Sequence, residues 1–379
     1  MKIKSLKYAE PRGSGWSLDV LNLKDGINLF VGASGSGKTR VLNIIFNIGT
    51  SATQDRLFNG EWTVQFEHSG VTYTWQYEGV SPDDREGPEG RVLSERLWIG
   101  SPDQVETSLF SRTETEFSLD SKQVPKLGKT STGIYLLREE DTIKPAHEAF
   151  SRIMRRRFWS DDLENSTNLT PIPLPLIRKL EKRADMLQMF RAPGSLHVVL
   201  YLLRRYFREQ YTSICDHFKR VFPFVEDIEI GTAAATLNVP LSTDIPMALI
   251  KERGIKKPVQ LNEIASGMQK VLLIITDVVT APPDVLYMID EYENSLGVNA
   301  IDFLPPFLAE VGGTRQFIIT THHPLLINAI PVADWFVFHR KGLNIKVTHG
   351  HEIESRYGRS KQQRFTQLIN DPLYTEGVE

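Results

Sequence analysis

The sequence of 379 residues contains a single cysteine, Cys215, and this scarcity excludes whole classes of protein. One cysteine cannot form an intrachain disulfide or a cysteine-based zinc site, and its rarity indicates a reducing compartment. Long apolar runs are lacking too, because the longest lies near residues 271–279 and is interrupted by Asp277. A membrane helix needs about 20 apolar residues, so we expect a cytoplasmic protein without a membrane segment or a signal peptide.

The sequence also lacks a large excess of positive or negative charge, and it lacks internal repeats. The 44 Lys and Arg nearly balance the 47 Asp and Glu, and the net charge of −3 does not by itself indicate a nucleic-acid binder. The content of 41% hydrophobic and 24% charged residues is typical of folded domains and excludes disordered or collagen-like chains. No heptad pattern is sustained, so we expect no long coiled coil.

A glycine-rich segment follows a short apolar stretch, residues 26–31, and precedes a helical pattern at residues 40–46. It fits G-x-x-x-x-G-K-[ST], the Walker A pattern, in which glycines let backbone N–H groups approach phosphate oxygens. The helix N-terminus adds the positive end of a dipole. In this pattern Lys38 reaches the phosphates and Thr39 ligates Mg²⁺. The predicted phosphate loop consists of Gly32, Ala33, Ser34, Gly35, Ser36, Gly37, Lys38 and Thr39.

A second apolar stretch, residues 285–289, ends in the acidic residues Asp290 and Glu291. Five consecutive apolar residues bounded by prolines and charge are typical of a buried strand in a parallel sheet. Open α/β sheets bind ligands at the carboxyl ends of such strands. Asp290 is therefore the candidate Mg²⁺ acid, and Glu291 is the candidate base for an attacking water. The structural alternative is an acid pair at a helix N-terminus.

Two further segments complete the pattern. Residues 261–270 carry Ser266 and Gly267 ahead of an apolar run, and small residues that begin a helix can bind an anion. Residues 316–320 predict a buried strand, which is followed by His322 and by a proline that opens a helix. A histidine at the same sheet edge as the acidic pair can act as a γ-phosphate sensor.

The order of these motifs resembles the ATPase head of the ATP-binding-cassette (ABC) class, in its soluble SMC/OLD-like branch. The segments DEYENSLG and TTHHP are similar to those of AAA-type ATPases of the ABC class in bacterial anti-phage defence systems. The resemblance implies an α/β ABC head with an antiparallel β-subdomain and a helical insertion, which hydrolyses ATP with Mg²⁺. It also implies that two heads sandwich ATP, with Ser266 and Gly267 contacting it in trans. Ser295 lies in the D-loop and His322 is the switch histidine.

The sequence departs from the family pattern at three places. The signature reads IASGMQ, so Ala265 or Ser266 stands at the usual serine, and the D-loop ends in Gly297. His323 stands where the family often has serine, which favours His322 as the switch. The glutamine of the Q-loop has several candidates, which are Gln65, Gln76 and Gln104.

The motifs divide the chain into three intervals. Residues 1–144 hold the Walker A motif and a β-subdomain, in which residues 62–66 and 71–77 predict a hairpin. Residues 145–222 predict a basic helical insertion or short arm, and residues 223–379 hold the signature, Walker B, D-loop and switch histidine. The helices expected in or near the insertion span residues 146–159, 175–189 and 195–222.

The stretch from residue 151 to residue 220 is basic, with 14 Lys and Arg against 7 Asp and Glu. Basic residues interleaved with tyrosines can follow a nucleic-acid backbone, so DNA is a possible ligand. A solvated helix face or a face for an acidic protein explains the same pattern. The candidate nucleic-acid contacts are Arg155, Arg156, Arg157, Arg204, Arg205 and Arg208.

Together these features predict the sensor and ATPase component of an anti-phage defence system, which forms a homodimer or higher homo-oligomer. A separate effector protein would supply any toxic activity, because no TOPRIM-like acidic cluster follows the head. Two alternatives remain open. One is a RecF-type recombination ATPase, and the other is an ATP-binding scaffold that hydrolyses little, which Ala265 in the signature favours.

Overall fold

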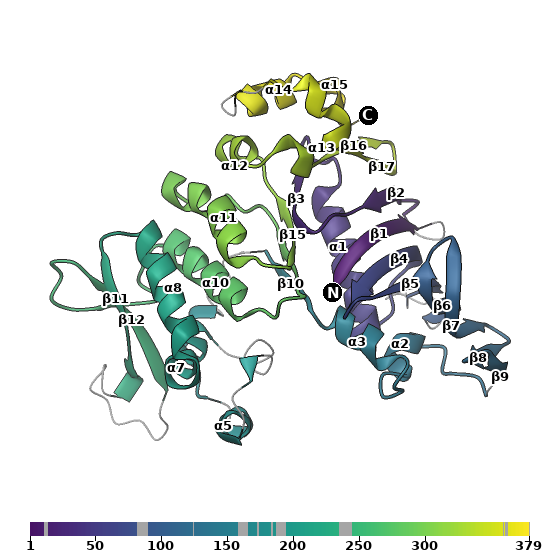
Figure 1. Cartoon of the computed structure of the whole chain (residues 1–379), viewed down its shortest axis with the longest axis horizontal. Helices are drawn as coiled ribbons and strands as arrows, with labels where there is room; N and C mark the ends of the chain where they lie inside the picture. The colour runs from purple at the N-terminus through teal and green to yellow at the C-terminus, as the bar shows by residue number, and fades with distance from the viewer. Residues whose placement is uncertain are drawn as a thin grey trace. The chain divides into compact units, whose positions relative to one another are not determined.

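The structure is a computed structural model in which the chain forms two compact units (Figure 1). Unit 1 comprises Met1–Arg156, Asp284–Glu291 and Thr314–Glu379, and unit 2 comprises Arg157–Pro283 and Tyr292–Gly313. The structure describes residues 1–10, 14–81, 90–123, 125–157, 166–172, 174–182, 185–186, 195–234, 245–358, 360 and 363–378. No helix among these residues is long and apolar enough to span a bilayer.

Unit 1 is built on one 14-stranded sheet, at one side of which five neighbouring strands run parallel. In sheet order these are β10 (Ile153–Arg156), β14 (Leu286–Ile289), β15 (Gln316–Thr320), β3 (Gly26–Val31) and β16 (Trp335–Lys341). Every residue of β14 and β15 is buried, as the continuous apolar runs of a parallel sheet require. The strands predicted from these runs are confirmed, and their carboxyl ends meet at one edge.

The rest of the sheet is mostly antiparallel. The predicted hairpin is confirmed as β4 and β5, and its turn contains Ser69 and Gly70 with φ of 52° and 79°. Trp62 of β4 stacks on Tyr77 of β5 with ring centroids 3.9 Å apart, which adds to the core. The strands are β17 (Asn344–His349), β2 (Ser17–Asn22), β1 (Lys2–Ala9), β4 (Gly60–His68), β5 (Val71–Val80), β6 (Arg91–Ser101), β7 (Gln104–Thr113), β8 (Phe117–Leu119) and β9 (Lys122–Gln123).

The helices of unit 1 include α1, which follows the phosphate loop and buries an apolar face containing Val41, Ile45 and Ile48. The i, i+4 and i+7 spacing of these residues places them on one side of the helix. The helices are α1 (Lys38–Thr53), α2 (Gly133–Leu136), α3 (Lys144–Phe150), α12 (Pro324–Ala329), η1 (Val332–Asp334), α13 (Gly350–Ile353), η2 (Glu354–Arg356), α14 (Arg364–Ile369) and α15 (Pro372–Thr375).

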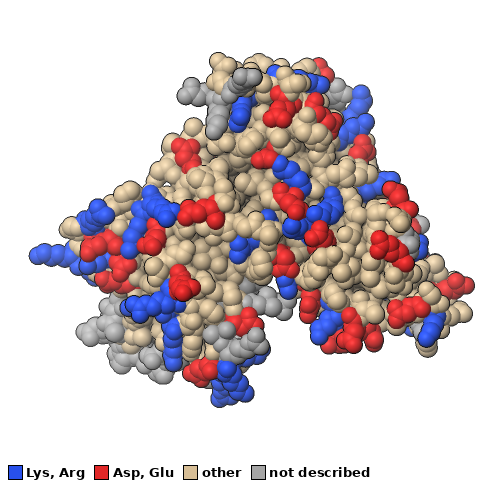
Figure 2. Space-filling view, in the orientation of Figure 1, with Lys and Arg blue, Asp and Glu red and all other residues tan. Residues whose placement is uncertain are grey.

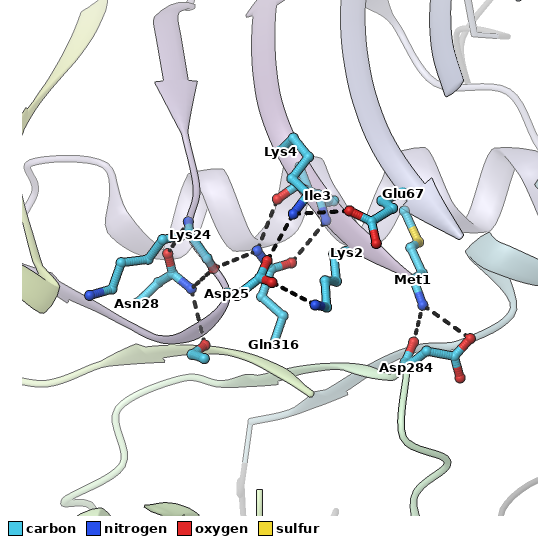
Figure 3. A network of polar contacts seen from close by, with 11 residues as sticks. Met1, Lys2, Ile3, Lys4, Lys24, Asp25, Asn28, Glu67, Asp284 and Gln316 are labelled. Atoms are coloured by element: carbon cyan, nitrogen blue, oxygen red, sulfur yellow. Dashed lines mark hydrogen bonds and ion pairs between the residues drawn. The ribbon is translucent and has the colours of Figure 1, made fainter. Parts of the chain in front are cut away.

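A buried polar network joins β1 to the parallel strands (Figure 3). The Gln316 amide accepts a hydrogen bond from Ile3 N and donates one to Ile3 O, both at 2.9 Å. The Asn28 amide donates to Phe317 O at 3.1 Å and accepts from Lys24 N at 2.9 Å. Both amide side chains are fully buried and hydrogen-bonded, so Gln316 holds β15 against β1 and Asn28 holds β3 against β15.

Unit 2 combines helices with a small antiparallel sheet in the order β11, β12 and β13. Helix α7 packs on β12, and α8 packs on α10, which is buried along nearly its whole length. The elements are α5 (Leu174–Lys182), α7 (Leu196–Tyr206), α8 (Arg208–Val221), β11 (Val225–Thr232), β12 (Pro246–Glu252), β13 (Val259–Gln260), α10 (Ser266–Thr280) and α11 (Val298–Val311).

The helix expected at residues 146–159 is confirmed only at its start and is wrong beyond it, while residues 158–159 lie outside the described residues. Helix α3 ends at Phe150, and residues 153–156 form the edge strand β10. Backbone pairing with β14 decides this, because Leu286 N donates to Arg152 O and Asp290 N donates to Arg156 O, each at 3.1 Å. Tertiary hydrogen bonds thus override the local helical pattern.

The other two expected helices are shorter than predicted. The one expected at residues 195–222 breaks at Phe207, where φ is −139° and ψ is 62°, into α7 and α8. These helices have 11 and 14 residues, or about 16 and 21 Å at 1.5 Å per residue. The one expected at residues 175–189 is seen as α5, which ends at Lys182, and residues 183–184 and 187–189 of the expected range lie outside the described residues.

Candidate nucleotide site

The phosphate loop connects β3 to α1 and needs glycine at two positions. Gly32 has a φ of 140°, and a Cβ atom there would lie 2.4 Å from the carbonyl oxygen of Phe338. Gly37 has a φ of 104°, and a Cβ atom there would lie 2.5 Å from Cδ1 of Ile345. Both the backbone conformation and the close neighbours exclude a side chain, which explains the Walker A spacing in physical terms.

Lys38 lies folded over this loop. Its side chain is buried, with the residue only 6% exposed, and Nζ donates hydrogen bonds to Gly32 O at 2.8 Å and Ala33 O at 3.0 Å. The ammonium group therefore lies at the first turn of α1, where the helix dipole is also positive. This is the charge and geometry that suit a phosphate group.

Asp290 is the meeting point of three elements of unit 1. Its Oδ1 accepts a hydrogen bond from Thr39 Oγ1, at the start of α1, at 3.1 Å. The same atom accepts a second hydrogen bond from Thr320 Oγ1, at the end of β15, at 2.8 Å. The structure thus brings together Thr39 and Asp290, which the sequence predicts as metal ligands, and adds Thr320.

Glu291 follows Asp290 with a left-handed backbone, with a φ of 48°. This conformation is rare for a residue with a side chain, and it is held by a hydrogen bond of 2.7 Å from Glu291 N to Thr320 Oγ1. Glu291 is exposed and lines a cavity of about 340 Å³ together with His322. The cavity is lined by Trp16, Ser34, Gly35, Gly37, Lys38, Thr39, Arg40, Glu291, Thr320 and His322.

The two adjacent histidines have different places. His323 caps α12, because its Nδ1 accepts a hydrogen bond from Leu325 N at 3.3 Å. His322 lies on the cavity wall. This difference favours His322 over His323 as the group that senses a phosphate.

The residues of this cavity, together with Asp290, which is hydrogen-bonded to two of them, fit a nucleotide with Mg²⁺. Thr39 Oγ1 and Asp290 Oδ1 are oxygen donors 3.1 Å apart, and Mg²⁺ is bound by few protein oxygens together with water and phosphate. Lys38 and the loop N–H groups would hold the phosphates. Trp16 offers an aromatic surface at the cavity wall, with the Arg40 guanidinium 4.2 Å from its ring centroid.

The signature segment lies in unit 2. Ser266 is the first residue of α10 and is exposed, while Ala265 occupies the N-cap position without a side-chain hydrogen bond. At Gly267 a Cβ atom would lie 2.5 Å from Ser295 O, and Ser295 has a φ of 65°. The structure therefore packs the signature glycine against the predicted D-loop residue.

Lys270 is a residue of this region that sequence reasoning missed. It is fully buried, and its Nζ donates hydrogen bonds to Tyr292 O at 2.6 Å and Asn294 O at 2.9 Å. The lysine thereby joins the signature helix to the segment before the D-loop. A lysine inside a buried apolar helix, four residues after Ser266, is the sequence signal that could have revealed it.

The structure does not place Arg155 on a basic helix surface. Arg155 lies in β10 with a side chain only 3% exposed, and its Nη2 pairs with Asp290 Oδ2 at 2.8 Å. Its guanidinium is therefore withdrawn from the surface expected to contact nucleic acid. Arg156 also lies in β10, and Arg157 begins the other compact unit, so the three arginines do not form one helical face.

The remaining candidate arginines lie on helices of unit 2. Arg204 donates to Ile230 O at 3.0 Å, and Arg205 is 3.8 Å from Glu181 in an ion pair. Arg208 lines a hollow that also contains Glu209 and Glu310. Figure 2 shows Lys and Arg interspersed with Asp and Glu over the visible face.

The three glutamines considered for the Q-loop lie in antiparallel strands of unit 1. Gln65 is in β4, Gln76 is in β5, and Gln104 begins β7. They are not among the residues that line the cavity.

A family model described as "AAA domain, putative AbiEii toxin, Type IV TA system" matches residues 201–328. This part of the chain contains the segments predicted as signature, Walker B, D-loop and switch. A search of curated proteins finds no match.

Solved structures of SMC heads match nearly the whole chain. An SMC head bound to the C-winged helix domain of ScpA is 14% identical, with a TM-score of 0.50 over 92% of this chain and 98% of that one. An SMC head with an extended coiled coil, bound to the C-terminal domain of ScpA derived from Pyrococcus furiosus, is 12% identical. Its TM-score is 0.50 over 94% of this chain and 98% of that one.

At these identities the likeness is one of fold. The fold is that of the SMC-head ABC class, and the fold class predicted from the sequence is confirmed.

Proposed function

We propose that this protein is a Mg²⁺-dependent ATPase whose heads pair around ATP. The hydrogen bonds of Thr39 and Thr320 to Asp290 carry the proposal, together with the bond that fixes Glu291 to Thr320 beside Lys38. Phosphoryl transfer needs groups that neutralise charge on the phosphates and a group that orients water. The cavity contains candidates for both.

Each residue has a role that follows from its position. Lys38 offsets phosphate charge, and Thr39 and Asp290 would hold Mg²⁺, which neutralises charge on the phosphate oxygens. The Glu291 side chain is exposed in the cavity, where it can orient a water and accept its proton. The hydrogen bond from Glu291 N to Thr320 Oγ1 fixes the direction in which that side chain leaves the backbone.

Pairing of heads is the part of the proposal that involves unit 2. Ser266 is exposed at the N-terminus of the long buried helix α10, where N–H groups can meet a phosphate of another chain. The resemblance to ABC heads supports contact in trans by Ser266 and Gly267, within a homodimer or larger homo-oligomer. Ser295 would support Gly267 through the packing described above.

In the cell we propose a sensor and ATPase role in anti-phage defence, with a separate effector protein. The DEYENSLG and TTHHP segments support this, and so does the family description, which names a toxin–antitoxin system. A cytoplasmic location remains a prediction from the sequence. DNA binding also remains a prediction, for which the exposed Arg204, Arg205 and Arg208 are the candidate contacts.

The test compares steady-state ATP turnover of wild type with Glu291→Gln. We expect a loss of about 100-fold or more, the usual effect of removing a general base, while ATP binding is retained. The variant should then accumulate the ATP-bound pair, so light scattering with Mg-ATP should show a doubled mass. Glu61→Gln makes the same chemical change at an exposed position of β4 and should leave turnover unchanged.

Two results would contradict the proposal in different ways. Wild-type turnover no higher than that of Glu291→Gln would favour the ATP-binding scaffold, a function that Ala265 at the helix cap also suits. An unchanged mass with Mg-ATP would remove head pairing but leave the hydrolytic site intact.

A further inference from the structure

The Walker B carboxylate is shared between the nucleotide cavity and a buried arginine. Asp290 Oδ1 accepts hydrogen bonds from Thr39 and Thr320, whereas Oδ2 pairs with Arg155 Nη2 at 2.8 Å. The Arg155 and Asp290 side chains are only 3% and 8% exposed. The charge of the arginine is therefore held in a place that solvent screens weakly.

The strand pairing and helix α1 explain how this arginine is held. In the parallel register of β10 and β14, Arg155 lies opposite Met288, two residues before Asp290. The second guanidinium nitrogen, Nη1, donates to Asn43 Oδ1 at 2.5 Å. Asn43 follows Thr39 by four residues on α1, so both face the same side of the helix. The planar guanidinium thus bridges the phosphate-loop helix and the Walker B strand.

This arrangement affects any cation that binds at Asp290 Oδ1 and Thr39 Oγ1. An arginine is always protonated, so one positive charge lies permanently across the same carboxylate. It offsets the negative charge that otherwise attracts a divalent cation, and it directs Oδ1 toward Thr39. Nucleotide phosphates would add the missing negative charge, so the cation would bind well only together with them.

We propose that Arg155 is a positioning residue that lowers the affinity of the site for divalent cations in the absence of nucleotide. The inference rests on the proposed ATPase function, because it takes Asp290 and Thr39 as the metal ligands. It assigns a role to a residue outside the Walker A, Walker B, signature, D-loop and switch motifs. The result is a site that takes up the cation with the nucleotide rather than before it.

The test measures Mn²⁺ binding to the protein without nucleotide. Electron paramagnetic resonance reports the concentration of unbound hexaaquo Mn²⁺, and the bound fraction follows by difference. Arg155→Met removes the charge while keeping an unbranched side chain, and we expect Mn²⁺ to bind about tenfold more tightly or better. Arg155→Lys keeps the charge and should stay close to wild type. A loss of structure alone would weaken cation binding, so a gain in affinity separates the charge effect from misfolding.

Arg152→Met is the matched control, because Arg152 directly precedes the same strand and pairs with Asp284 at the opposite end of β14. It should leave Mn²⁺ affinity unchanged. Equal Mn²⁺ affinities of wild type and Arg155→Met would overturn the inference. If Arg155→Met does not fold, Asn43→Ala tests the same idea, because it removes the second anchor of the guanidinium and should tighten Mn²⁺ binding by a smaller factor.

Nucleotide binding is measured separately, as the rise in melting temperature that Mg-ATP gives each protein. A wild type that binds no Mg-ATP would refute the proposed function whatever the Mn²⁺ result. A wild type that binds Mg-ATP, with no change in Mn²⁺ affinity in Arg155→Met or Asn43→Ala, would refute only the role of Arg155.

Discussion

Two arginine–aspartate pairs join β10 and β14, one at each end of the strand pair. Arg152 pairs with Asp284 where the strands begin, and Arg155 pairs with Asp290 where they end. Both pairs consist of an arginine in or next to β10 and an aspartate that flanks β14. Only the second pair lies at the carboxyl edge of the parallel sheet, where the phosphate loop and Glu291 also lie.

The Arg152–Asp284 pair lies at the amino end of β14, away from the phosphate loop, and its described neighbours differ from those of Asp290. Asp284 Oδ2 lies 3.2 Å from Nδ1 of His68, a buried residue at the end of β4. Around Asp290 there are instead the hydroxyl groups of Thr39 and Thr320. The position of an ion pair in the sheet, rather than its residue types, therefore decides whether it only joins strands or also lies at the candidate site.

The largest effect should follow from changing the carboxyl edge itself. Lys38→Ala removes the ammonium group from the phosphate loop, so the rise in melting temperature with Mg-ATP should disappear. At a hundredfold excess of ligand over Kd, this corresponds to a loss of about 2.7 kcal/mol of ligand stabilisation. Lys7→Ala, an exposed lysine on β1, is the control and should keep the full rise. An unchanged rise in Lys38→Ala would show that the nucleotide binds elsewhere.

A smaller loss of function is expected when an uncharged side chain at the same edge, Thr320, is changed. Thr320→Val keeps the shape of the side chain but leaves Asp290 Oδ1 and Glu291 N without the hydroxyl that both contact. We expect ATP turnover to fall about 10- to 100-fold, since a lost hydrogen bond at a charged site costs about 1–3 kcal/mol.

Thr276→Val is the matched control for this change. Thr276 is also buried, but its hydroxyl donates to Leu272 O within α10, so turnover should be unaffected. Normal turnover in Thr320→Val would mean that the hydroxyl does not hold the acidic pair in its working geometry.

The smallest effect should come from the pair at the amino end. Burial alone would raise the pKa of the Asp284 carboxyl, but the hydrogen bond from Arg152 and the charges of the Met1 ammonium group, Arg152 and His68 outweigh it and hold that pKa below the usual 3.8. A lowered folded-state pKa contributes stability that is present above the unfolded value and is lost as the pH falls through the folded value. Asp284→Asn should therefore cost about 0.5–1 kcal/mol of unfolding free energy at pH 7.

Urea unfolding at several pH values checks this expectation. The difference between wild type and Asp284→Asn should shrink below a pH of about 4, where the Asp284 carboxyl of the unfolded chain begins to be protonated while that of the folded protein stays charged. Nucleotide binding should stay normal at neutral pH. Impaired Mg-ATP binding in Asp284→Asn would erase the distinction between the two ends of the strand pair.

Much of the fold could be predicted from short segments. The strands β3, β14 and β15 and the β4–β5 hairpin were predicted because their apolar runs, alternation and turn residues are local signals. The strand β10 was mistaken for part of a helix, because its residues make sense as a strand only beside β14, about 130 residues away in the sequence.

The residues of the candidate site also fall into those that local motifs reveal and those that only tertiary contacts reveal. Lys38, Thr39, Asp290, Glu291 and His322 could be named from motifs that each lie within one short segment. Three other residues carried weaker signals, namely Thr320, Arg155 and Lys270. Their partners are distant in sequence or are backbone carbonyls, so neither composition nor spacing could reveal the contacts.

By itself the sequence determined that this chain has a phosphate loop, because backbone binding of phosphate needs glycines and a lysine at fixed local spacing. The sequence also determined the acidic pair at the end of a buried strand. Only the tertiary structure decided which distant charges share that edge. Parallel pairing of β10 with β14 placed Arg155 across the carboxylate of Asp290, and hydrogen bonds between separate segments form only once the sheet is assembled.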